Sequence, residues 1–266
     1  MASAAPVTLY FHGLPGSAAE LRAFGPQIAA VTEDFHVVAR DLQRPSASRR
    51  DYFDGLAESI ERTVATGEVR LVGFSLGAAA ALQVAPRLGA RVSQIDLVSP
   101  AGPLGLGDFI AHMAGAPVFR AAQAGRLAFA AFTAMQAQFA RFASRRLATA
   151  LMAKARGADR ALTTDPQFLA QLAFSLRSSL LEQRAAYVEE IRLYVADWSA
   201  ELAKVRQPVT IWQGSEDDWT PPMMARALAE ALPDQPEVNM LSGLSHFSTL
   251  RFYLESMVAQ PLREQP

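Results

Sequence analysis

Short apolar runs alternate with segments of helical spacing along most of this chain. A run such as Val7-Thr8-Leu9-Tyr10-Phe11 is too short for a helix and ends at a turn, so it predicts a buried strand. Similar runs predict strands at residues 7–11, 36–40, 69–72, 92–98, 209–212 and 238–241. Helical spacing predicts helices at 17–31, 52–66, 78–85, 222–232 and from about 247 onward. This alternation predicts an α/β fold with a mostly parallel central sheet flanked by helices on both faces.

The stretch from residue 103 to residue 204 interrupts the alternation, because no run within it predicts a strand. Asp165-Pro166 instead predicts a helix start, with an N-cap followed by proline at the first helical position. Three sets of apolar residues lie at helical spacing: Phe132, Met135, Phe139 and Phe142; Leu169, Leu172, Leu176 and Leu180; Val188, Ile191, Val195 and Trp198. We expect an all-helical insertion at 103–204 between two parts of one core, 1–102 and 205–266. The first set is expected to pack inside the insertion rather than to line a substrate pocket.

Composition narrows the class of protein. The chain has 266 residues, 50% of them hydrophobic, which is enough for one sizeable core. Its 25 basic and 26 acidic residues nearly balance, so we expect neither a nucleic-acid-binding surface nor a polybasic membrane patch. The absence of cysteine excludes disulfides, thiolate catalysis and cysteine-based zinc sites. No apolar stretch reaches the roughly 20 residues of a membrane span, and no basic leader precedes the first strand, so we expect a cytoplasmic protein.

The pentapeptide Gly73-Phe74-Ser75-Leu76-Gly77 lies between a predicted strand and a predicted helix. A serine on so tight a turn needs a strained backbone, and glycines two residues to either side let the neighbouring segments pack closely. The turn would present Ser75 at a helix N-terminus, where backbone N–H groups and the helix dipole favour a developing oxyanion. The pattern predicts a nucleophilic serine. The alternative is a small residue at a tight turn, without chemistry.

An activated serine needs a base, and the base needs an acid that orients it. The carboxyl ends of parallel strands share one edge of a sheet, so residues that follow the strands at 209–212 and 238–241 can meet Ser75. His246 follows the last strand and is the candidate base. Glu216, Asp217 and Asp218 follow the earlier strand and are the candidate acids.

The other chemistry-bearing residues fit a structural role better. His12 precedes a glycine-rich turn and is expected to orient that turn by a ring hydrogen bond. His36 begins a strand and is expected at the opposite edge of the sheet, and His112 lies in the helical insertion as a solvated residue. Asp96 falls inside a strand, and Asp41 is expected to form a turn. Trp219, beside the candidate acids, fits a pocket wall and an exposed rim equally well.

With these motifs in place, the sequence resembles the α/β-hydrolase superfamily over nearly its whole length. The resemblance rests on Gly-Phe-Ser-Leu-Gly at 73–77, His-Gly-Leu-Pro-Gly-Ser at 12–17, Gly-Ser-Glu-Asp-Asp-Trp-Thr-Pro at 214–221 and the isolated histidine at 246. It implies that Ser75 is the nucleophile, Asp217 the orienting acid and His246 the general base. Asp217 is preferred to its neighbours because it lies three residues after Gly214 and four before Pro221, which is the family's spacing.

The same resemblance implies an oxyanion hole formed by the backbone N–H groups of Leu14 and Leu76, and it implies no cofactor and no metal. The helical insertion matches the family's cap, which covers the site and shapes the substrate pocket. Two features depart from the family pattern. The chain reaches the strand before His12 almost at once, which implies a shortened sheet without the family's first two strands. Ser245 stands before the histidine, where glycine is frequent.

The activity that the resemblance implies is hydrolysis of a small, largely apolar carboxylic ester, thioester or lactone through an acyl-serine intermediate. One alternative keeps the same residues but performs carbon–carbon bond hydrolysis, a lyase reaction or other non-ester chemistry of secondary metabolism. Another is a non-catalytic, ligand-binding homologue. The expected partner is a small-molecule substrate. The sequence leaves the substrate and the oligomeric state open.

Overall fold

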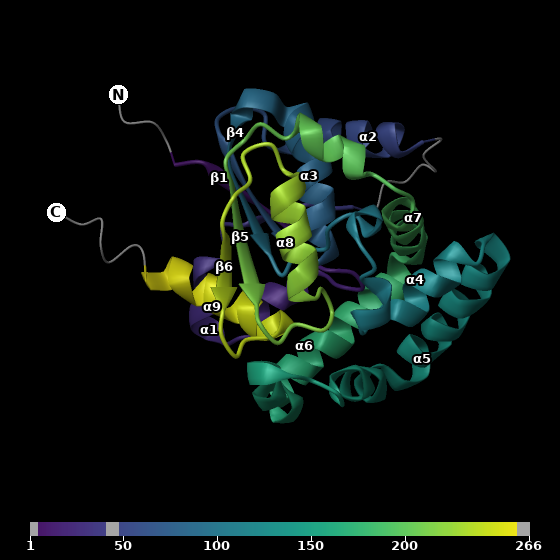
Figure 1. Cartoon of the computed structure of the whole chain (residues 1–266). Helices are drawn as coiled ribbons and strands as arrows, with labels where there is room; N and C mark the ends of the chain where they lie inside the picture. Colours follow the sequence, from purple (N-terminus) through teal and green to yellow (C-terminus); the bar gives the residue numbers. More distant parts are fainter. Residues whose placement is uncertain (1–4, 41–47, 260–266) are drawn as a thin grey trace.

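A computed structural model describes residues 5–40 and 48–259, and its centre is a six-stranded sheet in which every neighbouring pair is parallel (Figure 1). The strand order across the sheet is β2-β1-β3-β4-β5-β6. The strands are β1 (Val7–Phe11), β2 (His36–Val37), β3 (Val69–Phe74), β4 (Val92–Val98), β5 (Val209–Gly214) and β6 (Val238–Leu241). The predicted α/β class with a parallel central sheet is confirmed, and all the carboxyl ends of the strands lie at one edge.

Helices cover both faces of this sheet. On one face α1 (Pro26–Val31) packs against α9 (His246–Ala259). On the other face lie α2 (Arg49–Thr63), α3 (Leu76–Leu88) and α8 (Pro222–Ala231) (Figure 1). The four central strands are accordingly apolar and fully buried at their midpoints, as at Leu9, Leu71, Ile95 and Ile211.

The predicted strand at 36–40 is too long, because β2 contains only His36 and Val37. The N–H of Val38 still donates to Tyr10 O on β1, but the chain then leaves the sheet edge. Arg40 is buried, where its guanidinium pairs with Glu190 of the helical insertion. The turn expected at Asp41 lies outside the described residues.

The predicted helix at 17–31 is wrong as one element. Ser17 does cap a helix, since its Oγ accepts from Ala19 N at 3.2 Å, but this is a short 3₁₀-helix, Ala18–Arg22. Gly25 then adopts a φ of 101°, and α1 begins at Pro26. Proline has no N–H to give to a preceding turn, so it begins a new helix rather than continuing one.

Between β4 and β5 every regular element of the chain is helical, as predicted. The longer helices are α4 (Ala116–Gln123), α5 (Arg126–Met152), α6 (Pro166–Arg177) and α7 (Arg184–Val195). They lie together beyond one end of the sheet (Figure 1). The predicted start of α6 is confirmed, since Asp165 Oδ1 accepts from the N–H groups of Gln167 and Phe168. No helix in the described ranges is both long enough and apolar enough to cross a membrane.

The apolar set on α5 does not pack inside the insertion, contrary to expectation. Met135, Phe139 and Phe142 are exposed, and only Phe132 of that set faces the interior. The opposite face of α5 packs instead, chiefly through Phe129 and alanines, against α4 and α6. The other two predicted apolar sets, which lie on α6 and α7 and in the segments that follow them, do supply buried residues, among them Leu172, Leu176, Leu180, Ile191 and Trp198.

Candidate active site

Ser75 occupies a strained turn between β3 and α3. Its backbone has φ 55° and ψ −126°, a region that residues other than glycine rarely enter. Two backbone hydrogen bonds hold it there, from Ser75 N to Val98 O and from Ala101 N to Ser75 O, both 3.0 Å. The flanking glycines are required by packing. A Cβ on Gly73 would lie 2.6 Å from Ala78 Cα, and one on Gly77 would lie 2.0 Å from Phe11 O.

His246 and Asp217 meet beside this turn. His246 is the first residue of α9, and Asp217 lies in the loop after β5. His246 Nδ1 is 2.9 Å from Asp217 Oδ2, and both side chains are buried. The carboxylate also accepts from the backbone N–H groups of Trp219 and Thr220, at 2.8 and 3.0 Å, and from Thr220 Oγ1 at 3.1 Å. These four donors fix the orientation of the carboxylate, and through it the histidine ring.

Asp217 and His246 also shift each other's pKa. Burial alone would raise the pKa of Asp217, but the His246 charge and the hydrogen bonds from His246 and Thr220 lower it below its ordinary value. Burial would likewise lower the pKa of His246, but the charge of Asp217 and its hydrogen bond raise it above the ordinary value. The arrangement therefore favours an aspartate beside an imidazole that gains a proton readily.

The neighbouring carboxylates do not contact the histidine. Asp218 pairs with Arg156 of the helical insertion at 3.0 Å, and Glu216 is exposed. Asp96 lies within β4 and pairs with Arg70 at 2.5 Å. His36 starts β2 and His112 is exposed in the insertion, as the sequence indicated.

Leu14 and Leu76 are the residues whose backbone N–H groups are expected to form an oxyanion hole. Leu14 and Leu76 both line the cavity that Ser75 and His246 line. In the described part of the chain, neither the N–H of Leu14 nor that of Leu76 donates a hydrogen bond to a protein acceptor. Leu76 is the first residue of α3, so its N–H adds to the positive end of the helix dipole. In the residues that the structure describes, Ser75 Oγ makes no hydrogen bond to His246.

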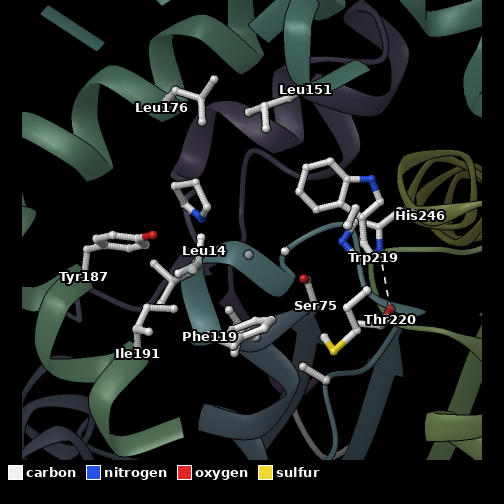
Figure 2. Close-up of a pocket in the computed structure, with 18 of the residues that line it drawn as sticks. Leu14, Ser75, Phe119, Leu151, Leu176, Tyr187, Ile191, Trp219, Thr220 and His246 are labelled. Carbon is white, nitrogen blue, oxygen red and sulfur yellow. Dashed lines mark hydrogen bonds between the residues drawn. The ribbon is translucent and has the colours of Figure 1, made fainter. Parts of the chain in front are cut away.

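A cavity of about 200 Å³ lies over Ser75, between the carboxyl edge of the sheet and the helical insertion. Figure 2 shows the Ser75 hydroxyl in this space, with Trp219 and His246 to one side and Leu151 and Leu176 across it. Trp219 lines the cavity and stacks on the His246 ring at 5.7 Å between centroids. Most of the remaining wall is apolar and comes from the insertion: Phe119, Leu151, Leu172, Leu176, Leu180 and Ile191.

The turn that carries Leu14 is held by a buried ion pair. Arg40 Nη1 contacts Glu190 of α7 at 2.9 Å, while Arg40 Nη2 donates to the carbonyls of His12 and Gly13. His12 Nδ1 lies 2.7 Å from Gly13 O, the predicted contact between ring and turn, and 2.9 Å from Arg40 Nη2. Burial and the nearby Arg40 charge lower the pKa of His12 to about 3, so the ring is neutral. Tyr52 completes the group by donating to Glu190 Oε1 at 2.6 Å.

Glu20 lines the cavity and was not predicted to do so. Its Oε2 accepts from Gly13 N at 3.1 Å and from Tyr10 Oη at 2.9 Å. Burial raises the pKa of Glu20 to about 7, although these hydrogen bonds and the charge of Arg40 oppose the shift. The sequence does carry a signal, Ser17-x-x-Glu20, but that pattern is typical of a helix N-terminus. Here the glutamate reaches back to the Gly13 turn instead.

The helical insertion also contacts the histidine's own helix, through a segment that the sequence analysis did not single out. Asp159 is buried, and its two oxygens accept from the N–H groups of Phe247 and Ser248 at 3.0 and 2.6 Å. These N–H groups belong to the first turn of α9, directly after His246. One residue earlier, Ala158 N donates to Gly243 O at 2.9 Å. Asp159 therefore takes the role of an N-cap from outside the helix.

Comparisons with known proteins agree with this architecture. A family model described as "Alpha/beta hydrolase family" matches residues 9–254. A bromoperoxidase from Bacillus anthracis is similar in structure, with a TM-score of 0.66, 15% identity, and coverage of 98% of this chain and 92% of that one. A thermophilic esterase from Thermogutta terrifontis has a TM-score of 0.65 and 17% identity, covering 99% and 91%. An enol-lactonase from Burkholderia xenovorans LB400 has a TM-score of 0.58 and 14% identity, covering 98% and 91%. At such identities these structures show a shared fold. A search of the curated proteins finds no match.

Proposed function

The chain belongs to the alpha/beta hydrolase family, and on that premise we propose that it hydrolyses a small, largely apolar carboxylic ester, thioester or lactone. One observation carries the proposal. The strained Ser75 and His246 line a single, mostly apolar cavity, and the buried Asp217 is hydrogen-bonded to the far side of the His246 ring. A nucleophile, a base and an orienting acid that converge on one cavity are what acyl transfer requires.

In the proposed mechanism Ser75 Oγ attacks the carbonyl carbon while His246 Nε2 takes the hydroxyl proton. The hydrogen bond between these two residues forms when substrate binds, as is common for catalytic contacts that are long in the free enzyme. The N–H groups of Leu14 and Leu76 hold the oxyanion. When the tetrahedral intermediate collapses, the bond from carbon to the alcohol oxygen or thiol sulfur breaks, and His246 returns the proton to the leaving group. Water then attacks the acyl-serine by the same route and releases the acid.

The size and apolar lining of the cavity support a small, apolar acyl group as the substrate. An apolar cavity of about 150 Å³ is enough to hold benzene, so the space over Ser75 fits an acyl group of similar or slightly larger size. Glu20 stands at the edge of this space near the Leu14 turn. A carboxylate there would oppose an oxyanion, so we expect Glu20 to serve through its bond to Gly13 N and to be protonated when substrate occupies the site.

The test is covalent labelling of the full chain with a small fluorophosphonate, followed by a panel of esters and thioesters of increasing acyl length. We expect one label, on Ser75, and turnover that declines for acyl groups too long for the cavity. Labelling without turnover of any ester, thioester or lactone would favour non-ester chemistry at the same serine. A folded protein that neither labels nor turns over would favour the ligand-binding alternative.

Leu176→Ala should change the preference among acyl groups, because Leu176 forms part of the cavity wall (Figure 2). We expect the ratio of kcat/KM for a longer to a shorter acyl ester to rise by roughly 10-fold, since one methylene in a pocket is worth about 1–3 kcal/mol. Phe139→Ala is the matched control, because Phe139 is exposed on α5 and does not line the cavity. Equal changes of preference in the two variants would show that the wall does not select the acyl group.

Asp159→Ala should lower kcat, because Phe247 and Ser248 lose the acceptor that fixes the start of α9, and His246 shifts with it. Misplacement by about 1 Å can cost on the order of 100-fold, and we expect a fall of 10- to 100-fold in kcat with little change in KM. The charge of Asp159 also helps to raise the pKa of His246. The acidic limb of the pH profile should therefore move to lower pH in this variant.

Asp165→Ala is the control for Asp159→Ala. Asp165 accepts from two N–H groups in the same way, but it caps α6, and both of its hydrogen bonds are to residues of α6 rather than of α9. We expect Asp165→Ala to change KM alone, because the start of α6 helps to position the leucines of that helix that line the cavity. If the two variants lost kcat equally, or if the pH profile of Asp159→Ala stayed in place, Asp159 would be a general structural residue.

A further inference from the structure

One face of α5 is apolar, exposed and basic at once. The large hydrophobic residues that the described part of the chain exposes number seven, and four of them lie on this helix: Leu127 (89% exposed), Met135 (50%), Phe139 (55%) and Phe142 (80%). At about 100° per residue these four positions fall within an arc of roughly 120°, so they share one face. Single exposed hydrophobic residues are ordinary, but a contiguous set is typical of an interaction site.

Arginine residues lie along the same helix, Arg126 and Arg141 before a kink at Ala143 and Arg145 and Arg146 after it. Arg126, Arg141, Arg145 and Arg146 are exposed and form no salt bridge with any described residue. The guanidinium of Arg141 lies 5.8 Å from the centre of the Phe142 ring. Exposed phenylalanine and leucine beside arginine, on a helix without any acidic residue, match the composition of helices that lie in the plane of a lipid surface.

Positive charge is concentrated in the segment of the sequence that contains α5. Residues 109–158 hold 7 of the 25 basic residues and none of the 26 acidic ones, so the rest of the chain carries 18 basic and 26 acidic residues. The overall charge of −1 therefore conceals a segment of +7 and a remainder of −8. The expectation of neither a nucleic-acid-binding surface nor a polybasic membrane patch rested on that overall charge. Such a distribution would turn α5 toward a negatively charged surface and the remainder away from it.

We propose that the face of α5 formed by Leu127, Met135, Phe139, Phe142 and the neighbouring arginines docks on an anionic lipid surface. The helix lies on the bilayer and does not span it, consistent with the absence of any span-like helix in the described residues. The inner face of α5 contributes Phe132, Gln136, Leu147 and Leu151 to the cavity over Ser75. Docking would thus bring that cavity close to apolar molecules dissolved in the lipid.

Two other occupants fit the face less well. In a symmetric dimer through this face, Arg141, Arg145 and Arg146 of one copy would oppose the same residues of the other, and like charges at an interface are unfavourable. A nucleic acid would satisfy the arginines through its phosphates but would leave the exposed phenylalanines without a partner. An anionic lipid surface supplies both partners, phosphate groups for the arginines and acyl chains for the aromatic rings.

The test is flotation of the full chain with vesicles of phosphatidylcholine alone or mixed with phosphatidylglycerol. We expect binding to the mixed vesicles at low salt, weak binding to phosphatidylcholine, and a loss of binding as salt screens the charges. Arg141→Gln, Arg145→Gln and Arg146→Gln combined should lower the partition coefficient roughly 100-fold, because each basic residue contributes about 1 kcal/mol at such a surface. Phe139→Ser with Phe142→Ser should lower it at least about 10-fold without removing charge.

Matched controls are Met223→Ser and Phe252→Ser, which remove exposed hydrophobic side chains from other helices and should leave binding unchanged. Absence of binding to the mixed vesicles at low salt would overturn the proposal. So would binding that survives the double phenylalanine substitution, since the face would then bind any polyanion. A dimer in light scattering that the phenylalanine substitutions convert to a monomer, without vesicle binding by the original chain, would identify a second copy as the occupant. None of these measurements uses enzymatic activity, so they remain decisive if the proposed hydrolysis is wrong.

Discussion

Ser75→Ala should abolish turnover, with a loss on the order of 10⁶ in kcat, which is typical when a triad nucleophile is removed. The substitution deletes one hydroxyl, which lies at the cavity. Among the described residues this hydroxyl makes no hydrogen bond, so its removal costs the fold no such bond. The Cβ atom is kept, so the strained backbone at φ 55° is neither relieved nor worsened. The midpoint of thermal unfolding should therefore stay close to that of the original chain.

A second serine provides the matched control. Ser99 is also buried, also has a positive φ, and follows β4 at the same edge of the sheet. Its hydroxyl lies 3.4 Å from the backbone oxygen of His246 and is among the groups that lower the pKa of Asp217, but the proposed chemistry assigns it no bond-forming step. Ser99→Ala should keep most of the activity. If purified Ser75→Ala retained more than a few per cent of turnover, with its fluorophosphonate label lost, the covalent mechanism would be wrong.

Asp217→Asn should lower kcat by about 10⁴, the loss that the same change causes in a serine protease whose aspartate orients the histidine. Asp217 Oδ2 accepts from His246 Nδ1, so an amide in its place favours the wrong tautomer and no longer stabilises the imidazolium. Asp218→Asn is the adjacent control, because Asp218 pairs with Arg156 and not with His246. This variant should lose far less activity than Asp217→Asn. Equal losses at the two positions would move the assignment of the acid.

The pH profile gives a second readout for the same variant. The general base acts in its neutral form, so kcat/KM falls as pH drops through the pKa of His246. Asp217 raises that pKa above the ordinary histidine value, and Asp217→Asn should therefore move the acidic limb to lower pH. An acidic limb that stays in place in the variant would show that another group controls it.

The sequence was sufficient for the features that depend on local pattern. The strands at 7–11, 92–98 and 238–241 have the predicted bounds, because short apolar runs bordered by turns determine them. Asp217 meets His246, and Ser75 lines the same cavity as His246, because each of the three follows a parallel strand and the topology brings those ends to one edge. The glycine spacing around Ser75 was informative for a steric reason that the close contacts at Gly73 and Gly77 make plain.

The remaining features depend on contacts between distant residues, which periodicity does not encode. Nothing local pairs Arg40 with Glu190, 150 positions away, or places Asp159 against the start of α9. The apolar spacing of α5 correctly gave a helix but could not tell which side of it would be covered. The charge segregation, in contrast, was readable, because no acidic residue occurs between Asp108 and Asp159. The net charge of the whole chain, −1, does not reveal it.

The contact of residues 158–159 with the histidine loop limits how this protein can be recombined. A chimera that received the insertion of a relative would carry new cavity walls, but it would lack Asp159 under Phe247 and Ser248 and the bond from Ala158 to Gly243. Such a chimera would then combine the cavity walls of the relative with a displaced His246. Graft boundaries that keep residues 156–159 from the recipient should avoid this, and laboratory evolution of new specificities should find its tolerated changes among the leucines facing the cavity rather than in that short segment.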